Sequence, residues 1–358
     1  MSEAPKIRQG TKYAKVLEGL RQKIQSGEYT GLLPGVQALG KEYGVNLMTA
    51  NKAVNMLVEE GLLYRIPRQG TYVKRMRSHT MAALLPNPYG PLQGYLIHGV
   101  EGGSRSIDNH FIFKAHRDDP AQELEAVKSL FNDNKADGLV LWPCQSRLDS
   151  PAVDYLRDHD FPVVMVLAVP RQDNPEFCSV ISDEQLGGEM ATEHLIEQGC
   201  KKIVCVVPNG GVDLSMKNQA RRSGYRKAME KAGLEVDVDL HVDFEKHGAR
   251  EGFDVSQDLI DQLKEYDGVF FFNDVIATSA MKMMERSGMS IPDDIAVVGF
   301  DNIELAELFG ISSVWQNFKQ IGITAAEMLM KRIENRDLPA EQIVLPPELI
   351  VRKSSRRI

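Results

Sequence analysis

The chain has 358 residues and a formal net charge of −8 at pH 7, with 43% hydrophobic and 26% charged residues. At about 100–200 residues per domain, this length predicts two or three domains that need neither disulfides nor a metal to fold, and the composition is ordinary for a globular protein. No run of about 18 apolar residues is present, which excludes a membrane-spanning helix. Because the first ten residues are polar and lack the apolar segment of a signal peptide, we expect a cytoplasmic protein with no membrane partner.

None of the four cysteines forms a C-x-x-C pair, and all but Cys178 lie in or beside apolar, strand-like runs. A lone cysteine in such a run behaves as a small hydrophobic residue. We therefore expect neither a metal site nor a cofactor, and we expect buried, reduced thiols at Cys144, Cys178, Cys200 and Cys205.

Positive charge is concentrated at the beginning of the chain. Residues 1–77 contain 13 lysines and arginines against six aspartates and glutamates, a net charge of +7, which leaves −15 for the rest. A basic segment on an acidic body predicts that this segment alone contacts a polyanion, although chance variation on a solvated surface is the alternative.

The sequence predicts a small first domain over residues 1–76. Apolar residues recur at helical spacing in three stretches, and two short runs around a turn at 67–70 predict a hairpin. Helix, helix, turn, helix and hairpin is the order of a winged helix-turn-helix of the α+β class. The expected helices are 13–24, 36–43 and 47–60, and the expected strands are 62–66 and 71–73.

After the basic segment 74–79, strands alternate with helices, which predicts parallel sheets with helices on both faces. This second domain, residues 77–358, is long for one such sheet, so we expect a two-lobed α/β domain. Ligands of such folds bind at the carboxyl ends of the strands. The expected strands are 80–85, 110–115, 138–142, 162–167, 202–207, 268–272 and 295–299, and the expected helices are 121–134, 185–198, 218–232, 250–264 and 274–287.

A helix-turn-helix places the N-terminal residues of its second helix in the major groove of double-stranded DNA. There, amide, hydroxyl and amino groups bond adenine, phosphate or guanine, and a cation on a narrow hairpin fits a minor groove. A solvated helix face and a solvated turn are the alternatives. The expected DNA-binding residues are Asn46, Leu47, Met48, Thr49, Asn51 and Lys52 on the helix, and Arg68, Gln69 and Gly70 on the hairpin.

Nearly all of residues 10–75 resembles the GntR family of winged-helix regulators. The resemblance implies DNA contacts at positions 37, 46, 47, 49 and 51 and on the wing at 68–70, which adds Gln37 to the candidates. It is carried by Leu33-Pro34, Leu39, Tyr43-Gly44-Val45, Met48-Thr49, Lys52-Ala53, Leu57-Val58-Glu59-Glu60-Gly61-Leu62-Leu63 and Gln69-Gly70-Thr71-Tyr72-Val73.

The chain departs from that family where bases would be read. The family usually has serine or threonine followed by arginine at 46–47, and often arginine at 37 and 51. This chain has Asn46, Leu47, Gln37 and Asn51. We therefore expect base recognition that differs from that of a typical member.

Residues 80–354 resemble the effector domain of LacI/GalR-type repressors, a periplasmic-binding-protein-like type I fold. A GntR-type head on this body resembles the arabinose-responsive repressor group. The resemblance is carried by Asp183, Gly187, His194-Leu195-Ile196-Glu197-Gln198-Gly199, Arg221-Arg222-Ser223-Gly224-Tyr225-Arg226-Lys227-Ala228, Phe272-Asn273-Asp274, Ile295-Ala296-Val297-Val298-Gly299-Phe300-Asp301-Asn302, Gln316 and Leu349-Ile350-Val351-Arg352-Lys353-Ser354.

Three polar residues of this body suit a polyhydroxylated ligand. Arg221 offers a planar fork of donors, Asp301 accepts two hydroxyl hydrogen bonds, and Asn273 both donates and accepts. The resemblance implies that they line the cleft between the lobes. The alternatives are a surface ion pair for Arg221 and turn or cap roles for the other two. The remaining effector-binding candidates are Asn87, Tyr89, His116, Trp142 and Gln316, of which Trp142 could equally pack in the core.

These features together predict a homodimeric, sequence-specific transcriptional repressor that binds double-stranded operator DNA and responds to a small effector, which we expect to be a sugar. An enzyme is the first rival, but no G-x-G-x-x-G or G-x-x-x-x-G-K-[ST] loop and no nucleophile–base pair is present, so we expect no catalytic residues. A sugar-binding transport protein is the second rival, and the basic head and missing signal peptide argue against it.

Overall fold

The chain forms two compact units, Met1–Thr80 with Val127–Asp137, and Met81–Ala126 with Gly138–Ile358. The computed structural model describes residues 12–25, 28–29, 31–66, 70–73, 78–87, 90–103, 110–144, 148–159, 161–168, 176–208, 216–236, 239–247 and 250–356.

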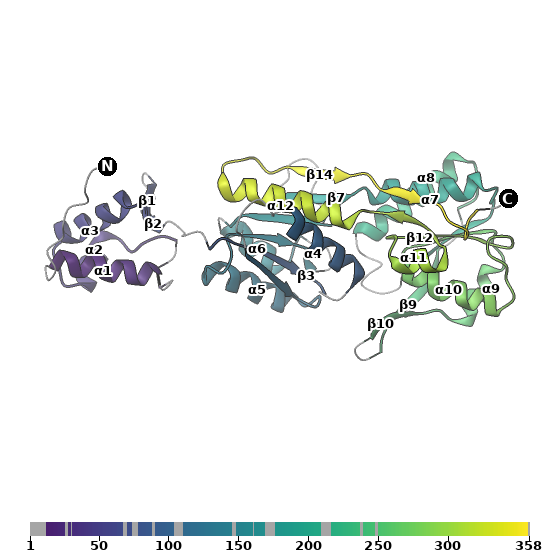
Figure 1. Ribbon diagram of the computed structural model, residues 1–358, viewed down its shortest axis with the longest axis horizontal. Helices are drawn as coiled ribbons and strands as arrows, with labels where there is room; N and C mark the ends of the chain where they lie inside the picture. The colour runs from purple at the N-terminus through teal and green to yellow at the C-terminus, as the bar shows by residue number, and fades with distance from the viewer. Residues whose placement is uncertain are drawn as a thin grey trace. The chain divides into compact units, whose positions relative to one another are not determined.

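The first unit contains a winged helix-turn-helix, as the sequence predicts (Figure 1). Its three helices enclose a small apolar core in which Leu20, Leu39 and Leu57 are fully buried. The two strands pair antiparallel and form the wing. The elements are α1 (Lys12–Gln25), α2 (Val36–Glu42), α3 (Leu47–Glu59), β1 (Leu63–Ile66) and β2 (Gly70–Val73).

The second unit has two lobes, which confirms the predicted periplasmic-binding-protein-like architecture. The N-terminal lobe is built on a six-stranded sheet of order β14-β7-β6-β5-β3-β4. Its strands are β3 (Thr80–Leu85), β4 (His110–Ala115), β5 (Gly138–Leu141), β6 (Val163–Val166), β7 (Cys178–Ser182) and β14 (Gln342–Leu345), and its helices are α4 (Pro91–Gly103), α6 (Pro151–Asp158) and α12 (Phe318–Glu334). Helix α5 (Pro120–Asn132) begins in this unit, and its residues from Val127 on are counted with the first unit.

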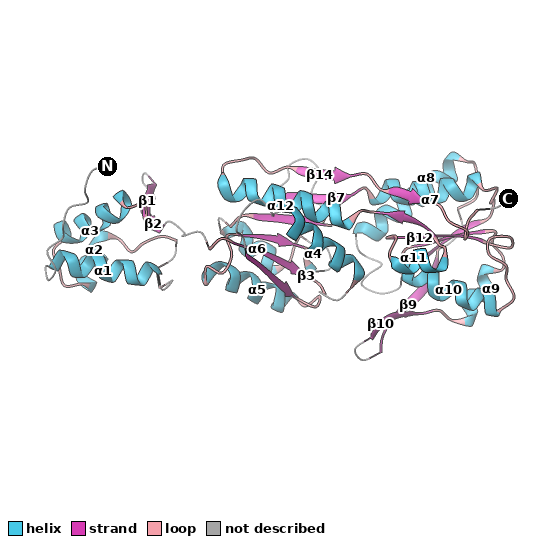
Figure 2. Ribbon diagram, in the orientation of Figure 1, coloured by secondary structure: helices cyan, strands magenta, loops and turns pink. Residues whose placement is uncertain are grey.

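The C-terminal lobe is built on a seven-stranded sheet of order β10-β9-β8-β11-β12-β13-β15. Helices flank the strands of both sheets (Figure 2), which is why strands such as β3 and β8 are buried along their whole length. The strands are β8 (Ile203–Pro208), β9 (Leu240–His247), β10 (Arg250–Asp254), β11 (Gly268–Phe271), β12 (Ala296–Phe300), β13 (Ser312–Trp315) and β15 (Glu348–Ile350), and the helices are α7 (Glu184–Glu197), α8 (Met216–Lys231), α9 (Gln257–Leu263), α10 (Asp274–Arg286) and α11 (Glu304–Phe309).

The chain passes between the lobes three times, after β7, after β13 and after β14. The segments after β7, β13 and β14 therefore connect the two lobes, and each begins at the carboxyl end of its strand. Among the helices that the structure describes, none is both long enough and apolar enough to span a membrane.

One predicted helix is wrong in part. The sequence favours a helix over 250–264, whereas 250–254 is strand β10, paired antiparallel with β9, and only α9 is helical. The pairing with β9 decides the conformation of this segment, because strand formation depends on neighbouring strands more than on local preference. The expectation that Cys178 lies outside the strands is also wrong, because it is a buried residue of β7. All four cysteines are free and buried, as expected.

Glycines let two helices of the N-terminal lobe approach closely. A Cβ at Gly99 of α4 would lie 2.1 Å from the carbonyl oxygen of Lys319, and a Cβ at Gly322 of α12 would lie 2.3 Å from that of Leu96. Both obstacles are backbone atoms, so a side chain at either position forces the two helices apart.

We expect Gly99→Ala to lower the free energy of unfolding by about 1–3 kcal/mol, because the helices must separate to admit the methyl group. Gly94 provides a control on the same helix, since a Cβ there meets nothing within 4 Å. Gly94→Ala should be neutral or stabilise by about 0.5–1 kcal/mol through its helix preference. Urea unfolding of both variants measures the difference, and equal stabilities would contradict the close packing of α4 on α12.

Candidate functional site

The beginning of α3 presents an unusual mixture of side chains. Asn46 is the N-cap of this helix, where its Oδ1 accepts a hydrogen bond of 2.8 Å from the backbone N–H of Thr49. Leu47 and Met48 are 53% and 82% exposed. The helix begins here because the asparagine side chain satisfies one of the backbone donors that every helix N-terminus leaves unpaired.

The next polar residues of α3 contact other parts of the same domain. Asn51 accepts a hydrogen bond of 3.3 Å from Arg65 of β1, and Arg65 also donates to Asn55. The ammonium group of Lys52 lies 5.3 Å from the ring centroid of Tyr13. Both candidate readers thus already have partners within the domain.

The other DNA-binding candidates fall at two places. Gln37 is exposed on α2, and Gly70 begins β2 with a positive φ of 129°. Arg68 and Gln69 lie outside the described residues.

In the C-terminal lobe, Arg221 of α8 is the centre of a buried polar network. Its Nε donates to Glu184 of α7 at 2.7 Å, Nη2 lies 3.5 Å from the Asp301 carboxylate, and Nη1 donates to the carbonyl oxygen of Phe272. The guanidinium carbon also lies 3.8 Å from the centroid of the Phe300 ring. Arg221 is thus held in place by two anions, a carbonyl and an aromatic face.

Asp301 connects this network to Gln316. The Nε2 group of Gln316 donates to Asp301 Oδ1 at 2.8 Å, while Gln316 Oε1 is buried and has no hydrogen-bond partner among the described residues. Asp301 and Asn302 both have positive φ, 95° and 51°. A non-glycine residue in that region costs about 1–3 kcal/mol, so the surrounding structure must hold the turn after β12 in place.

Asp274, the first residue of α10, is completely buried beside this network. Its carboxylate accepts hydrogen bonds of 2.7 Å from Ser313 Oγ and 2.9 Å from the backbone N–H of Ile303. Burial and the nearby negative charge of Asp301 raise the pKa of Asp274 to about 8. At neutral pH this carboxyl group is mainly protonated.

The folded protein therefore holds a proton on Asp274 that the unfolded chain, with the ordinary carboxyl pKa, releases near pH 4. Between these two pKa values the free energy of unfolding should fall as the pH rises, by up to about 1.4 kcal/mol per pH unit. Asp274→Asn should remove this part of the slope.

Urea unfolding at pH 5 to 8, followed by tryptophan fluorescence, measures the slope, because Trp142 and Trp315 are the only tryptophans and both lie in the second unit. Asp293→Asn, the same exchange at an exposed carboxylate, should keep the wild-type slope. An Asp274→Asn protein with the wild-type slope would show that Asp274 is ionised when folded.

Asn273 has the cap role that the sequence left open. Its Oδ1 accepts a hydrogen bond of 2.8 Å from the backbone N–H of Ile276 and begins α10. Asn273 follows β11, Asp301 follows β12 and Gln316 follows β13, so neighbouring parallel strands deliver the three side chains. Hydrogen bonds join Asp301 to both Gln316 and Arg221. Among the described residues, none of the hydrogen bonds of this network involves the Asn273 side chain.

The candidates of the N-terminal lobe form a second group. The His116 ring shares a 2.9 Å hydrogen bond between Nε2 and the carbonyl oxygen of Trp142, and the backbone N–H of Asp118 donates to Nδ1 at 3.1 Å. Nδ1 is thus the acceptor of the ring and Nε2 faces a carbonyl oxygen. Trp142 stacks on Phe318 with centroids 6.1 Å apart and belongs to the apolar core, and Asn87 follows β3. Tyr89 lies outside the described residues.

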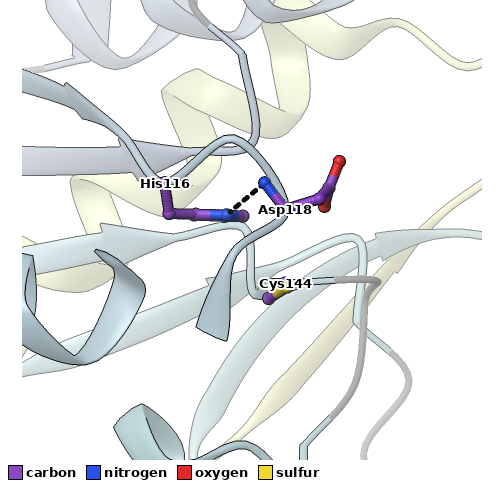
Figure 3. Close-up of side chains that lie close together, drawn as sticks. All are labelled: His116, Asp118 and Cys144. Atoms are coloured by element: carbon purple, nitrogen blue, oxygen red, sulfur yellow. Dashed lines mark hydrogen bonds between the residues drawn. The ribbon is translucent and has the colours of Figure 1, made fainter. Parts of the chain in front are cut away.

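His116, Asp118 and Cys144 are near one another, and one ligand atom from each lies within 4.8 Å of the others (Figure 3). In Figure 3 the Asp118 carboxylate points away from the thiol, while the backbone N–H of the same residue reaches His116. Both ring nitrogens are occupied, and Asp118 is exposed, so this arrangement gives no support for a metal.

Sequence reasoning missed four residues around Arg221. Glu184 follows strand β7, which the sequence did not predict, and Asp274 directly follows the predicted Asn273. Phe300 directly precedes Asp301 in the segment 295–302 that resembles LacI/GalR-type repressors. Ser313 lies in β13, another strand that was not predicted. Glu184 stands next to Asp183, which the resemblance to LacI/GalR-type repressors included, and this adjacency is the signal that could have indicated Glu184.

The fold thus defines a protein with a winged-helix unit and a two-lobed α/β unit whose buried polar groups meet at strand ends. Residues 12–73 match the family described as bacterial regulatory proteins, gntR family, and residues 192–355 match the periplasmic binding protein-like domain. The chain accordingly carries a gntR-type DNA-binding domain and a periplasmic binding protein-like domain.

Named relatives of this chain are transcriptional regulators. The HTH-type transcriptional repressor PurR of Aliivibrio fischeri (strain MJ11) is 27% identical over 282 residues, which are 77% of this chain and 81% of the relative. The HTH-type transcriptional regulator DegA of Bacillus subtilis (strain 168) is 26% identical over 335 residues, 88% of this chain and 96% of the relative. The chain is a DNA-binding transcriptional regulator with an effector-type domain, not an enzyme.

A solved structure shares the fold of the second unit. It is that of a periplasmic binding protein/LacI transcriptional regulator from Alkaliphilus metalliredigens QYMF complexed with D-xylulofuranose. The TM-score is 0.64 at 23% sequence identity, and the match covers 78% of this chain and all of the other.

Proposed function

We propose that this regulator is a cytoplasmic homodimeric repressor that binds operator DNA through residues 1–76 and releases it when residues 77–358 bind a small polyhydroxylated effector. The buried network around Arg221 carries the proposal. It presents a guanidinium, a carboxylate and the unpartnered oxygen of Gln316 at the carboxyl ends of neighbouring strands. Ligands of open α/β folds bind at such ends.

The backbone supports the same place. Six of the eight non-glycine residues with positive φ in the described segments follow the ends of β4, β6, β12 or β13. Strained residues of this kind persist where a function fixes the loop. They are Arg117, Asp118, Leu167, Asp301, Asn302 and Asn317.

The chemistry of the network favours a sugar. Hydroxyl groups of a polyol both donate and accept, so they match Asp301 and Gln316 Oε1 on one side and Arg221 on the other. The structural relative from Alkaliphilus metalliredigens was solved with a sugar, D-xylulofuranose. Asn87, which follows β3 in the N-terminal lobe, would contact the opposite side of the ligand, while His116, fully buried and bonded through both ring nitrogens, would hold the loops after β4 and β5.

The DNA side rests on the basic winged head. Two heads in a symmetric dimer would bind the two halves of a pseudo-palindromic operator, with Gln37, Thr49 and the wing residues Arg68, Gln69 and Gly70 at the DNA. An effector shifts the balance between two states only if it binds one of them better. We infer that the sugar stabilises a state in which the heads are no longer matched to both half-sites.

A thermal-shift screen of the full chain tests the effector, with pentoses, hexoses, their phosphates and purine bases as probes. A compound at 100 times its dissociation constant stabilises the protein that binds it by about 2.7 kcal/mol. A selective sugar shift, followed by loss of binding to a selected operator in fluorescence anisotropy, is the expected result. A purine that shifts the protein while all sugars fail would overturn the sugar assignment, and a monomer in sedimentation equilibrium would overturn the dimer.

A further inference from the structure

The N-terminal turn of α3 exposes two large apolar side chains that the domain core does not use. The buried core of the head takes Ala50, Ala53 and Leu57 from this helix. Leu47 and Met48 lie outside that cluster and are 53% and 82% exposed. Single exposed apolar residues are common. Two in succession at the start of the expected recognition helix form an apolar surface that indicates a binding partner.

The polar residues around this surface are engaged within the domain. Asn46 caps the helix, Asn51 accepts from Arg65, and Lys52 lies over the Tyr13 ring. Base reading by asparagine or lysine would require these contacts to be given up or shared. The apolar pair needs no such rearrangement.

The net charge of the winged head indicates which kind of partner binds the apolar surface of Leu47 and Met48. Residues 1–77 carry a net charge of +7, so a polyanion is the favoured partner of this domain. In the major groove of DNA, the one apolar group on a base edge is the 5-methyl group of thymine. A protruding methionine and leucine match that group in polarity and size.

We propose that Leu47 and Met48 read thymine through its 5-methyl group and thereby set the operator preference of this regulator. This inference rests on the proposed operator binding. Phosphate contacts from the basic head supply affinity without sequence information, and the apolar pair supplies the choice of base. The preferred operator then has T·A pairs where α3 enters the groove.

Replacing thymine by deoxyuridine tests the proposal, because it deletes the methyl group and keeps every hydrogen bond of the base pair. Selection from a random DNA library with the full chain first yields the preferred site. Deoxyuridine is then placed at each thymine in turn, and anisotropy measures the affinity. We expect about fourfold weaker binding at the positions that α3 contacts, the value of one buried methyl-sized group.

Variants assign the effect to the side chains. Met48→Ala and Leu47→Ala should bind the thymine and deoxyuridine sites equally at their own positions, whereas Met48→Leu, which keeps an apolar side chain, should keep most of the difference. Leu308→Ala removes a leucine of α11 in the second unit that is 77% exposed, more than Leu47, and should change neither affinity. Circular dichroism checks that each variant is folded.

Other outcomes separate the two levels of the proposal. A selected site whose affinity is the same with deoxyuridine at every thymine overturns methyl reading and leaves operator binding intact. A library that yields no preferred sequence overturns operator binding, and methyl reading with it. Self-association that is lost in Met48→Ala while DNA binding is unchanged would assign the surface to a second copy of the chain and overturn the proposal.

Discussion

Arg221→Met should lower the free energy of unfolding of the second unit by about 3–5 kcal/mol, the usual cost of removing one partner from a buried ion pair. Glu184 and Asp301 both face Arg221 and are almost fully buried. Without the guanidinium, two carboxylates lie near each other with no cation between them. The cation–π contact with Phe300 is lost as well.

Urea unfolding followed by tryptophan fluorescence measures this loss, since both tryptophans report on the second unit. Arg226 is the matched control, because it lies on the same helix with an exposed side chain whose Nη2 is 3.8 Å from Asp239. Arg226→Met should cost less than about 1 kcal/mol. In the Arg221→Met background, Glu184→Gln should restore part of the stability. Equal costs at the two arginines would contradict a charged, buried network.

The order of elements in the winged head, and the alternation of strands with helices in the second unit, could be predicted from the sequence, because apolar periodicity and turn residues are local signals. The strands that were missed have weak local signals. Two of the five residues of β7 and two of the four residues of β13 are serines, so neither strand is a continuous apolar run. Their place is fixed by neighbouring strands, which pattern alone does not reveal. The prediction of a helix at 250–264 was wrong over 250–254 for the same reason.

The candidate site shows a similar division. Arg221 and Asp301 are 80 positions apart, so no spacing rule joins them, and only the resemblance to LacI/GalR-type repressors placed them together. Their partner Glu184 was missed because it follows an unpredicted strand. An asparagine side chain such as that of Asn46 or Asn273 can contact a ligand or cap a helix. In the structure both residues cap a helix. Sequence gives residue types, whereas partners depend on the tertiary fold.

Asp301→Asn should weaken effector binding about 10- to 150-fold and leave operator affinity without effector unchanged. A hydrogen bond to a charged group contributes about 1.5–3 kcal/mol, and the exchange removes that charge while keeping an oxygen that can accept from Gln316. Calorimetry with the sugar found by thermal shift measures the affinity, and anisotropy measures the effector concentration that releases DNA. Asp293→Asn, at an exposed site of the same lobe, should match wild type in both. Because the effector acts only through its preference for one state, weaker binding must move the release curve to higher concentration by the same factor. An unchanged release curve would place the effector away from Asp301.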